Sequence, residues 1–222
     1  MEYFNKAFLR FLKNLDENNN REWFHANKKS YEEDVKIPFE NFIGLMIDNM
    51  QAIDPTIVIT PKDAIFRIHR DVRFSKDKSP YKNHVSAIIS KGGRKDMSTP
   101  GLYLQVSAKE FGIYSGAYMP DKNQLQGIRE AIASDLSGFE KLINAKAFIS
   151  KFGRIQGEKN KRIPKEFKEV AEQQALIANK QFYYIANLKA DTVLETKLPK
   201  ILMDHYQAAL PLSKFLSEAM GV

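Results

Sequence analysis

The fold is decided by residues 101–118, which read Gly-Leu-Tyr-Leu-Gln-Val-Ser-Ala-Lys-Glu-Phe-Gly-Ile-Tyr-Ser-Gly-Ala-Tyr. Leu102, Leu104 and Val106 alternate with Tyr and Gln in the first half, and the second half repeats the pattern from Phe111. A period of two places successive side chains on opposite faces of a β-strand. The link between the halves is short, whereas parallel neighbours need a crossover of about a dozen residues or more. The stretch therefore predicts antiparallel strands.

Two further extended segments precede this stretch. Residues 66–73 and 81–90 also alternate, and the turn-like residues 75–80 separate them. On a strand over 66–73, Phe66 and Ile68 would point to one face. The opposite face would carry Arg67, His69, Asp71 and Arg73.

Helical periodicity surrounds the strands. Apolar residues recur at three- and four-residue steps over residues 1–54 and again over residues 121–222. Asp121 is predicted to begin one helix and Ser137, in a capping box, another that ends at Gly153. Pro211 is predicted to interrupt the last helix, because proline lacks the N–H that a helix interior uses.

The order of helices, strands and helices predicts an α+β fold, with a central antiparallel sheet flanked by N-terminal and C-terminal helices. We expect a single domain over residues 1–222. A helical layer would occupy residues 1–54 and the sheet residues 56–118. Residues 121–222 would be mainly helical, with one strand near residues 181–188.

The composition narrows the functional class. The chain of 222 residues carries a net charge of +7, which favours acidic partners without identifying one. It contains no cysteine, which excludes disulfides, thiolate nucleophiles and cysteine-bound metals. The first residues do not resemble a signal peptide, and no apolar run approaches the roughly 20 residues of a spanning helix. We therefore expect a cytoplasmic protein that does not bind membranes.

Residues 67–84 hold the densest positive charge, with six Arg or Lys residues against two Asp residues. Such density predicts a site for an anion, most simply a phosphate group of a nucleotide, a phosphorylated metabolite or a nucleic-acid backbone. The floor of the site would be Arg67, His69, Asp71 and Arg73. The ligand-binding set would also include Arg70, Lys76, Lys78, Tyr81 and Lys82, with His84 at the rim. The alternative is a solvated face on which Asp71 pairs with Arg67 or Arg73.

Two other functions remain open at this level. His69 or His84 could act as an acid–base group with Asp71 as its orienting partner, in a phosphoester hydrolase or transferase. The same surface could instead bind an acidic protein. The spacing of the histidines predicts no metal site, and no cofactor is expected.

Two more basic loops lie outside this stretch. Residues 91–95 lack the spacing of a phosphate-binding loop. Residues 157–165 hold four basic residues against Glu158 and would extend the basic surface if they folded next to it. For each of these two segments, the simpler interpretation is a loop exposed to solvent.

The chain also resembles a bacterial and fungal family known as domain of unknown function 2461. The resemblance is carried by Phe-Leu-Lys-Asn-Leu-Asp-Glu-Asn-Asn-Asn-Arg-Glu-Trp-Phe at residues 11–24 and by Phe-Arg-Ile-His-Arg-Asp-Val-Arg-Phe-Ser-Lys-Asp-Lys-Ser-Pro-Tyr-Lys at residues 66–82. Residues 114–120 and 161–165 fit later blocks of the family. The resemblance implies a single-domain protein and supplies no activity, substrate or cofactor.

Overall fold

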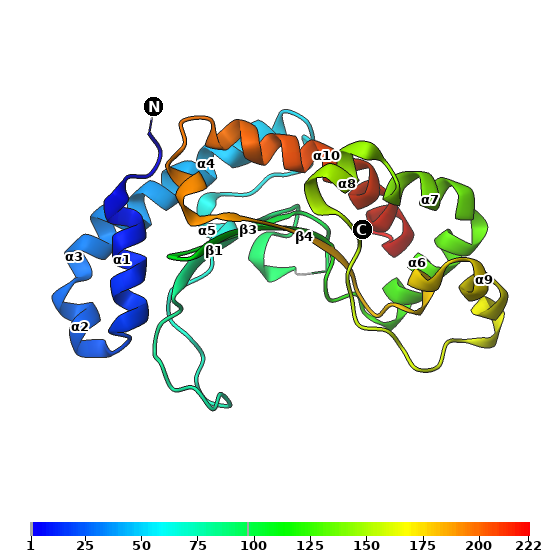
Figure 1. Ribbon diagram of the computed structural model, residues 1–222, viewed down its shortest axis with the longest axis horizontal. Coiled ribbons are helices and arrows are strands. Elements are labelled where there is room, and N and C mark those ends of the chain that lie inside the picture. Colours follow the sequence, from blue (N-terminus) through cyan, green and yellow to red (C-terminus); the bar gives the residue numbers. More distant parts are fainter. Residues whose placement is uncertain (1, 97) are drawn as a thin grey trace. The chain divides into compact units, whose positions relative to one another are not determined.

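The computed structural model describes residues 2–96 and 98–222. Figure 1 traces the chain from the N-terminal helices in blue, through the sheet, to the C-terminal helix in red. Four strands pair in the order β1-β2-β3-β4. They are β1 (His84–Ile89), β2 (Leu102–Ser107), β3 (Glu110–Ala117) and β4 (Phe182–Lys189). The sheet is antiparallel and flanked by N- and C-terminal helices, which confirms the predicted α+β class.

Strand β2 follows the predicted alternation. Leu102, Leu104 and Val106 are buried, while the residues between them are half-buried. Only Ala108 and Lys109 separate β2 from β3. The strand expected near residues 181–188 is β4.

The chain divides into two compact units. The first contains the residues up to Lys95, Tyr103–Ile113 and Asn187–Met203, and the second contains Asp96–Leu102, Tyr114–Ala186 and Asp204–Val222. Strands β3 and β4 each contribute residues to both units. This division into two units does not test the expectation of a single domain, which stays a prediction.

The first unit begins with α1 (Lys6–Glu17), which buries the predicted stripe of Phe8, Phe11, Leu12 and Leu15. Next come α2 (Arg21–Ala26), α3 (Lys28–Ser30) and a π-helical turn over Tyr31–Lys36. Helix α4 (Ile37–Gln51) continues from this turn without a break, and Pro38, which has no N–H to donate, lies just after the π-helical turn. The short helix α5 (Pro61–Ala64) and a 3₁₀ turn (Gly93–Lys95) complete the helical part of this segment.

The second unit confirms one predicted helix start and corrects another. Helix α6 (Lys122–Ser134) begins after Asp121, whose Oδ1 accepts hydrogen bonds from Asn123 N and Gln124 N at 2.8 and 2.9 Å. Helix α7 (Leu136–Ile143) begins two residues earlier than expected, because its N-cap is Asp135, whose Oδ1 accepts from Gly138 N at 2.8 Å. The capping box predicted at Ser137 is therefore wrong.

The predicted helix running on to Gly153 is also wrong in its extent. It is divided into α7 and α8 (Lys146–Phe152), although Gly153 ends the second piece as expected. A 3₁₀ turn (Lys165–Phe167), α9 (Lys168–Gln173) and a second 3₁₀ turn (Ala175–Ala178) lead into β4. The turn Ala190–Leu194 follows β4.

Helix α10 (Leu198–Met220) is continuous and contains Pro211, so the predicted interruption is wrong. Pro211 is exposed, as is Gln207, whose carbonyl loses its helical partner there. Water can hydrate that carbonyl, while Leu212 and Leu216 are buried on the opposite face. Burial on one face thus keeps the helix intact. No helix in the described part of the chain is long and apolar enough to cross a membrane.

Candidate functional site

The predicted basic site lies on an irregular antiparallel hairpin, residues 65–87, which we call the basic hairpin. Isolated bridges join Ile65 to Ala87 and His69 to Tyr81. The hairpin is the cyan-to-teal loop that leads into β1 in Figure 1. The regular strand predicted over residues 66–73 is therefore wrong, because only single positions pair.

The reason for the irregular pairing lies in the register. Three residues separate the two bridged positions on the first arm, whereas five separate them on the second. The extra residues form a bulge within residues 82–86, and a bulge interrupts the ladder of backbone hydrogen bonds. His84 lies in this bulge, and Lys82, whose N donates to Ile68 O at 2.8 Å, directly precedes it. Bulges of this kind re-aim side chains and occur often beside functional sites.

The base of the hairpin is held by the N-terminal helices. Asn19 Nδ2 donates to Tyr81 O at 2.9 Å, and Asn19 Oδ1 accepts from Tyr81 N at 3.1 Å. The Tyr81 ring is buried and stacks on Phe24 with centroids 4.0 Å apart. Asn83 Nδ2 also donates to Asp16 Oδ1 at 2.9 Å. Tyr81, predicted at the rim of the site, thus packs into the helical layer.

Two of the predicted cations have carboxylate partners. Arg73 Nη2 lies 2.6 Å from Asp71 Oδ2, and Arg70 pairs with Asp77. Hydrogen bonds from the Arg73 side chain and backbone lower the pKa of Asp71. Hydrogen bonds from Ser79 and then Arg70 lower the pKa of Asp77. These pairs neutralise part of the predicted strip.

Arg67 and Lys82 are different. In residues 2–96 and 98–222, neither has a carboxylate within ion-pair distance. Arg67 is exposed, and the half-buried Lys82 places its Nζ 5.2 Å from the centroid of the Phe66 ring. Burial, and then the charge of Arg67, lowers the pKa of Lys82. The charge of Arg67 also lowers the pKa of Asp71, but that carboxylate is hydrogen-bonded to Arg73.

His84 lies near Lys82 and Arg70. Its Nδ1 is 3.2 Å from Asn83 Oδ1. Burial, followed by the charges of Lys82 and Arg70, lowers the pKa of His84 from 6.5 to about 4. The imidazole is therefore neutral at pH 7, and an anion that offsets the two cationic charges would raise its pKa.

The other predicted side chains are not gathered around one point. Asp71 makes its described hydrogen bonds to Arg73. The His69 ring lies 5.2 Å from the Tyr81 ring. Lys78 Nζ donates to Val72 O at 2.9 Å, and Lys76 is exposed. No group of three or more metal-ligating side chains forms in the described residues.

Phe74, at the tip of the hairpin, is a candidate that the sequence reasoning missed. Its side chain is 96% exposed, and Arg73 Cζ lies 5.9 Å from its ring centroid. A large apolar ring left in water is informative where basic residues surround it. The alternation of residues 66–73 ended before Phe74, so only the break in the pattern indicated it.

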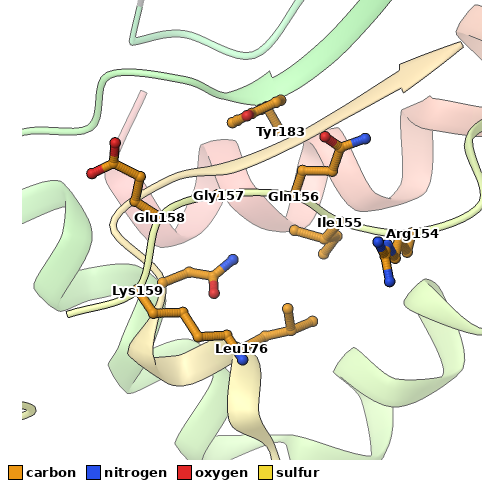
Figure 2. A pocket seen from close by; sticks show the side chains of 9 residues that line it. Arg154, Ile155, Gln156, Gly157, Glu158, Lys159, Leu176 and Tyr183 are labelled. Atoms are coloured by element: carbon orange, nitrogen blue, oxygen red, sulfur yellow. The ribbon is translucent and has the colours of Figure 1, made fainter. Parts of the chain in front are cut away.

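A second feature that the sequence did not indicate is a pocket of about 640 Å³ in the second unit. It is lined by Arg154, Ile155, Gln156, Gly157, Glu158, Lys159, Leu176, Asn179 and Tyr183. Figure 2 shows Arg154 and Lys159 approaching from different sides, with Ile155 and Leu176 between them, whereas Glu158 points away. The pocket includes the start of the basic loop over residues 157–165.

Comparison with known families finds a match over most of the chain. The model of the family described as "Conserved hypothetical protein (DUF2461)" matches residues 7–215. A comparison with curated proteins found no match.

Proposed function

Since this chain belongs to the DUF2461 family of conserved hypothetical proteins, whose description names no activity, we propose a function from the geometry of the basic hairpin. The hairpin binds phosphate groups through Arg67 and Lys82. The ligand is a single-stranded nucleic acid, whose backbone contacts these cations and whose bases contact the tip.

The observation that supports this proposal most strongly is that the neighbouring charges of Arg67 and Lys82 have no ion-pair partner among the described residues. Both are partly or fully exposed, and each lacks a carboxylate partner in the part of the chain that the structure describes. The charge of Arg67 lowers the pKa of Lys82, so the two like charges raise the free energy of the empty site. A phosphate group offsets both charges, and arginine can hold two of its oxygens at once.

The hairpin tip favours nucleic acid over a small metabolite. Phe74 is almost fully exposed beside Arg73, Lys76 and Lys78. Single-strand binders combine cations along the backbone with aromatic rings on which bases stack, and each stacked base contributes about 1–3 kcal/mol. The tip offers both groups on one short segment.

The contacts of the histidines favour binding over catalysis. Asp71 hydrogen-bonds to Arg73, and His69 packs near Tyr81. A general base oriented by a carboxylate needs the two groups within hydrogen-bond distance of each other. The hydrolase or transferase reading, with His69, His84 and Asp71, stays a prediction without a supporting contact.

The test is fluorescence anisotropy with a labelled single-stranded oligonucleotide at several salt concentrations. If the oligonucleotide makes four phosphate contacts with the hairpin, log K should fall with log salt with a slope of about −3, because each contact on a single strand contributes about 0.7 to the slope. Replacing both cations, Arg67→Met with Lys82→Met, should weaken binding about tenfold or more and make the slope shallower by about 1 or more.

The matched control is Arg10→Met with Lys6→Met, which removes one arginine and one lysine from the exposed face of α1. Equal loss of binding in both double variants would mean that only net charge matters, and the proposal would fail. A flat salt dependence with tight binding of a small phosphate compound would replace nucleic acid by a small ligand. Binding of an acidic protein alone would favour the interaction module.

A further inference from the structure

We propose that the pocket over residues 154–159 and 176–183 is a second ligand site, which binds a nucleoside monophosphate or an equivalent small organic anion with a planar N–H-bearing ring. All of its lining residues belong to the second unit. The basic hairpin belongs to the first unit, so the two proposals stand or fall separately. The volume of about 640 Å³ suits such a ligand, because small-molecule pockets span about 300–1,000 Å³.

The pocket presents two cations, and the carboxylate of its lining residue Glu158 pairs with Lys180 instead of with them. Glu158 lies 3.1 Å from Lys180, which leaves Arg154 and Lys159 without an ion-pair partner in the described residues. Both side chains are exposed and approach the pocket from different sides. A phosphate group entering the pocket would be attracted to both.

The remaining lining residues suit a planar ring. Tyr183 is half-buried, and its ring packs edge-on against Tyr118 with centroids 5.4 Å apart, which limits its freedom. Ile155 is buried and Leu176 is half-buried between the two cations. Aromatic and aliphatic walls with a few polar groups are the usual composition of small-molecule sites.

The side-chain amide of Asn179 would select a ligand that carries an N–H donor. Its side chain is 1% exposed, and Nδ2 donates to Gln181 O at 3.1 Å. That bond fixes the orientation of the amide, because a flipped amide would face one oxygen with another. Oδ1 is buried and accepts no hydrogen bond from a described residue. An N–H group of a ligand ring beside Asn179 would satisfy this oxygen.

Hydrogen bonds from Arg129 and Lys180 hold the backbone around Asn179. The buried Arg129 donates from Nε to Ile177 O at 3.0 Å and from Nη2 to Asn179 O at 3.4 Å. On the other side, Lys180 N donates to Glu158 O at 2.7 Å. These bonds fix the segment before a ligand arrives, so little ordering accompanies binding. Arg129 is thus a positioning residue for the site.

The experiment titrates the full chain with adenosine 5′-monophosphate, adenosine and inorganic phosphate, using calorimetry and ¹H–¹⁵N spectra. The Arg67→Met/Lys82→Met background removes binding at the hairpin. We expect shifts at the Gly157 amide and the Asn179 side-chain amide, and affinity for the nucleotide about tenfold above that for either part. Replacing the cations by Arg154→Met with Lys159→Met should lower nucleotide affinity about tenfold and leave adenosine binding unchanged.

Lys141→Met is the matched control, because Lys141 is exposed in the same unit and does not line the pocket. Tyr183→Leu should weaken both nucleotide and adenosine about fivefold, which separates ring stacking from charge. If inorganic phosphate binds as tightly as the nucleotide, the ring contributes no affinity, and the proposed contacts to the ring are wrong. Absence of shifts at Gly157 and Asn179 at about millimolar nucleotide would overturn the site.

Discussion

Asn19 holds the backbone of Tyr81 through both groups of its amide: Nδ2 donates to Tyr81 O at 2.9 Å and Oδ1 accepts from Tyr81 N at 3.1 Å. The two residues lie 62 positions apart. This pair attaches the second arm of the basic hairpin to the turn between α1 and α2. The hairpin therefore has a fixed base, although its tip is exposed.

Replacement of this residue, Asn19→Ala, is expected to lower the free energy of unfolding by about 1–3 kcal/mol, because two partly buried backbone groups lose their partners. Urea unfolding measures the loss, and amide exchange at Tyr81 should accelerate more than exchange in α4. Asn18→Ala is the control, since Asn18 bonds only within its own helix end. Equal losses in both variants would contradict the anchoring role.

The helices and the sheet were predictable where burial is periodic along the chain. The stripe of Phe8, Phe11, Leu12 and Leu15 and the alternation in β2 are local patterns that burial enforces. Pro211 misled the sequence reading because its cost depends on which face of α10 it occupies. That face is set by packing, which a local rule for proline does not contain.

The candidate site was predictable in composition but not in arrangement. The charges of residues 67–84 are evident in the sequence, whereas the bulge within residues 82–86 follows from the register of distant bridges. The pairing of Arg70 with Asp77 also depends on how the tip folds back. The pocket at Asn179 was not predictable, because it joins two loops separated by 3₁₀ and α-helical turns.

The low pKa of His84 makes stability depend on pH in a defined window. The folded pKa of about 4 lies below the ordinary 6.5, so the unfolded chain binds the proton first. Stability is fully present above about pH 7 and falls between about pH 6.5 and 4, by an amount on the order of 2 kcal/mol. In His84→Gln, urea unfolding at several pH values should show a flatter profile in this window. An unchanged profile would contradict the assignment.

Arg129 is expected to stabilise the second unit by bonding backbone carbonyls. Arg129→Met leaves Ile177 O and Asn179 O without these donors and should lower the free energy of unfolding by about 1–3 kcal/mol. Arg129→Lys should recover part of the loss. Arg162→Met, at an exposed position, should change it by less than about 0.5 kcal/mol. Similar stability of the Arg129→Met and Arg162→Met variants would mean that the buried guanidinium contributes nothing.

Alanine substitutions at two glycines with positive φ, Gly153 and Gly116, distinguish the cost of backbone strain from the cost of steric crowding. At Gly153 (φ +73°) an added Cβ meets nothing within 4 Å, whereas at Gly116 (φ +97°) it would lie 2.2 Å from Phe182 O. Gly153→Ala should therefore cost only about 1–2 kcal/mol of backbone strain. Gly116→Ala should cost about 1–3 kcal/mol more, because β3 and β4 must separate there. Thermal unfolding measures the stability of both variants. Equal losses of stability would contradict the close approach of Gly116 to Phe182 O.

The most direct test of the phosphate site is the pKa of His84, followed by NMR with and without a saturating single-stranded oligonucleotide. Burial is the main cause of this low pKa, and the charges of Lys82 and then Arg70 add to it, so an anion held beside Lys82 should raise the pKa by offsetting the Lys82 charge. The rise should disappear in the Arg67→Met/Lys82→Met variant. A pKa that stays at about 4 in the saturated complex would show that the phosphate groups bind elsewhere.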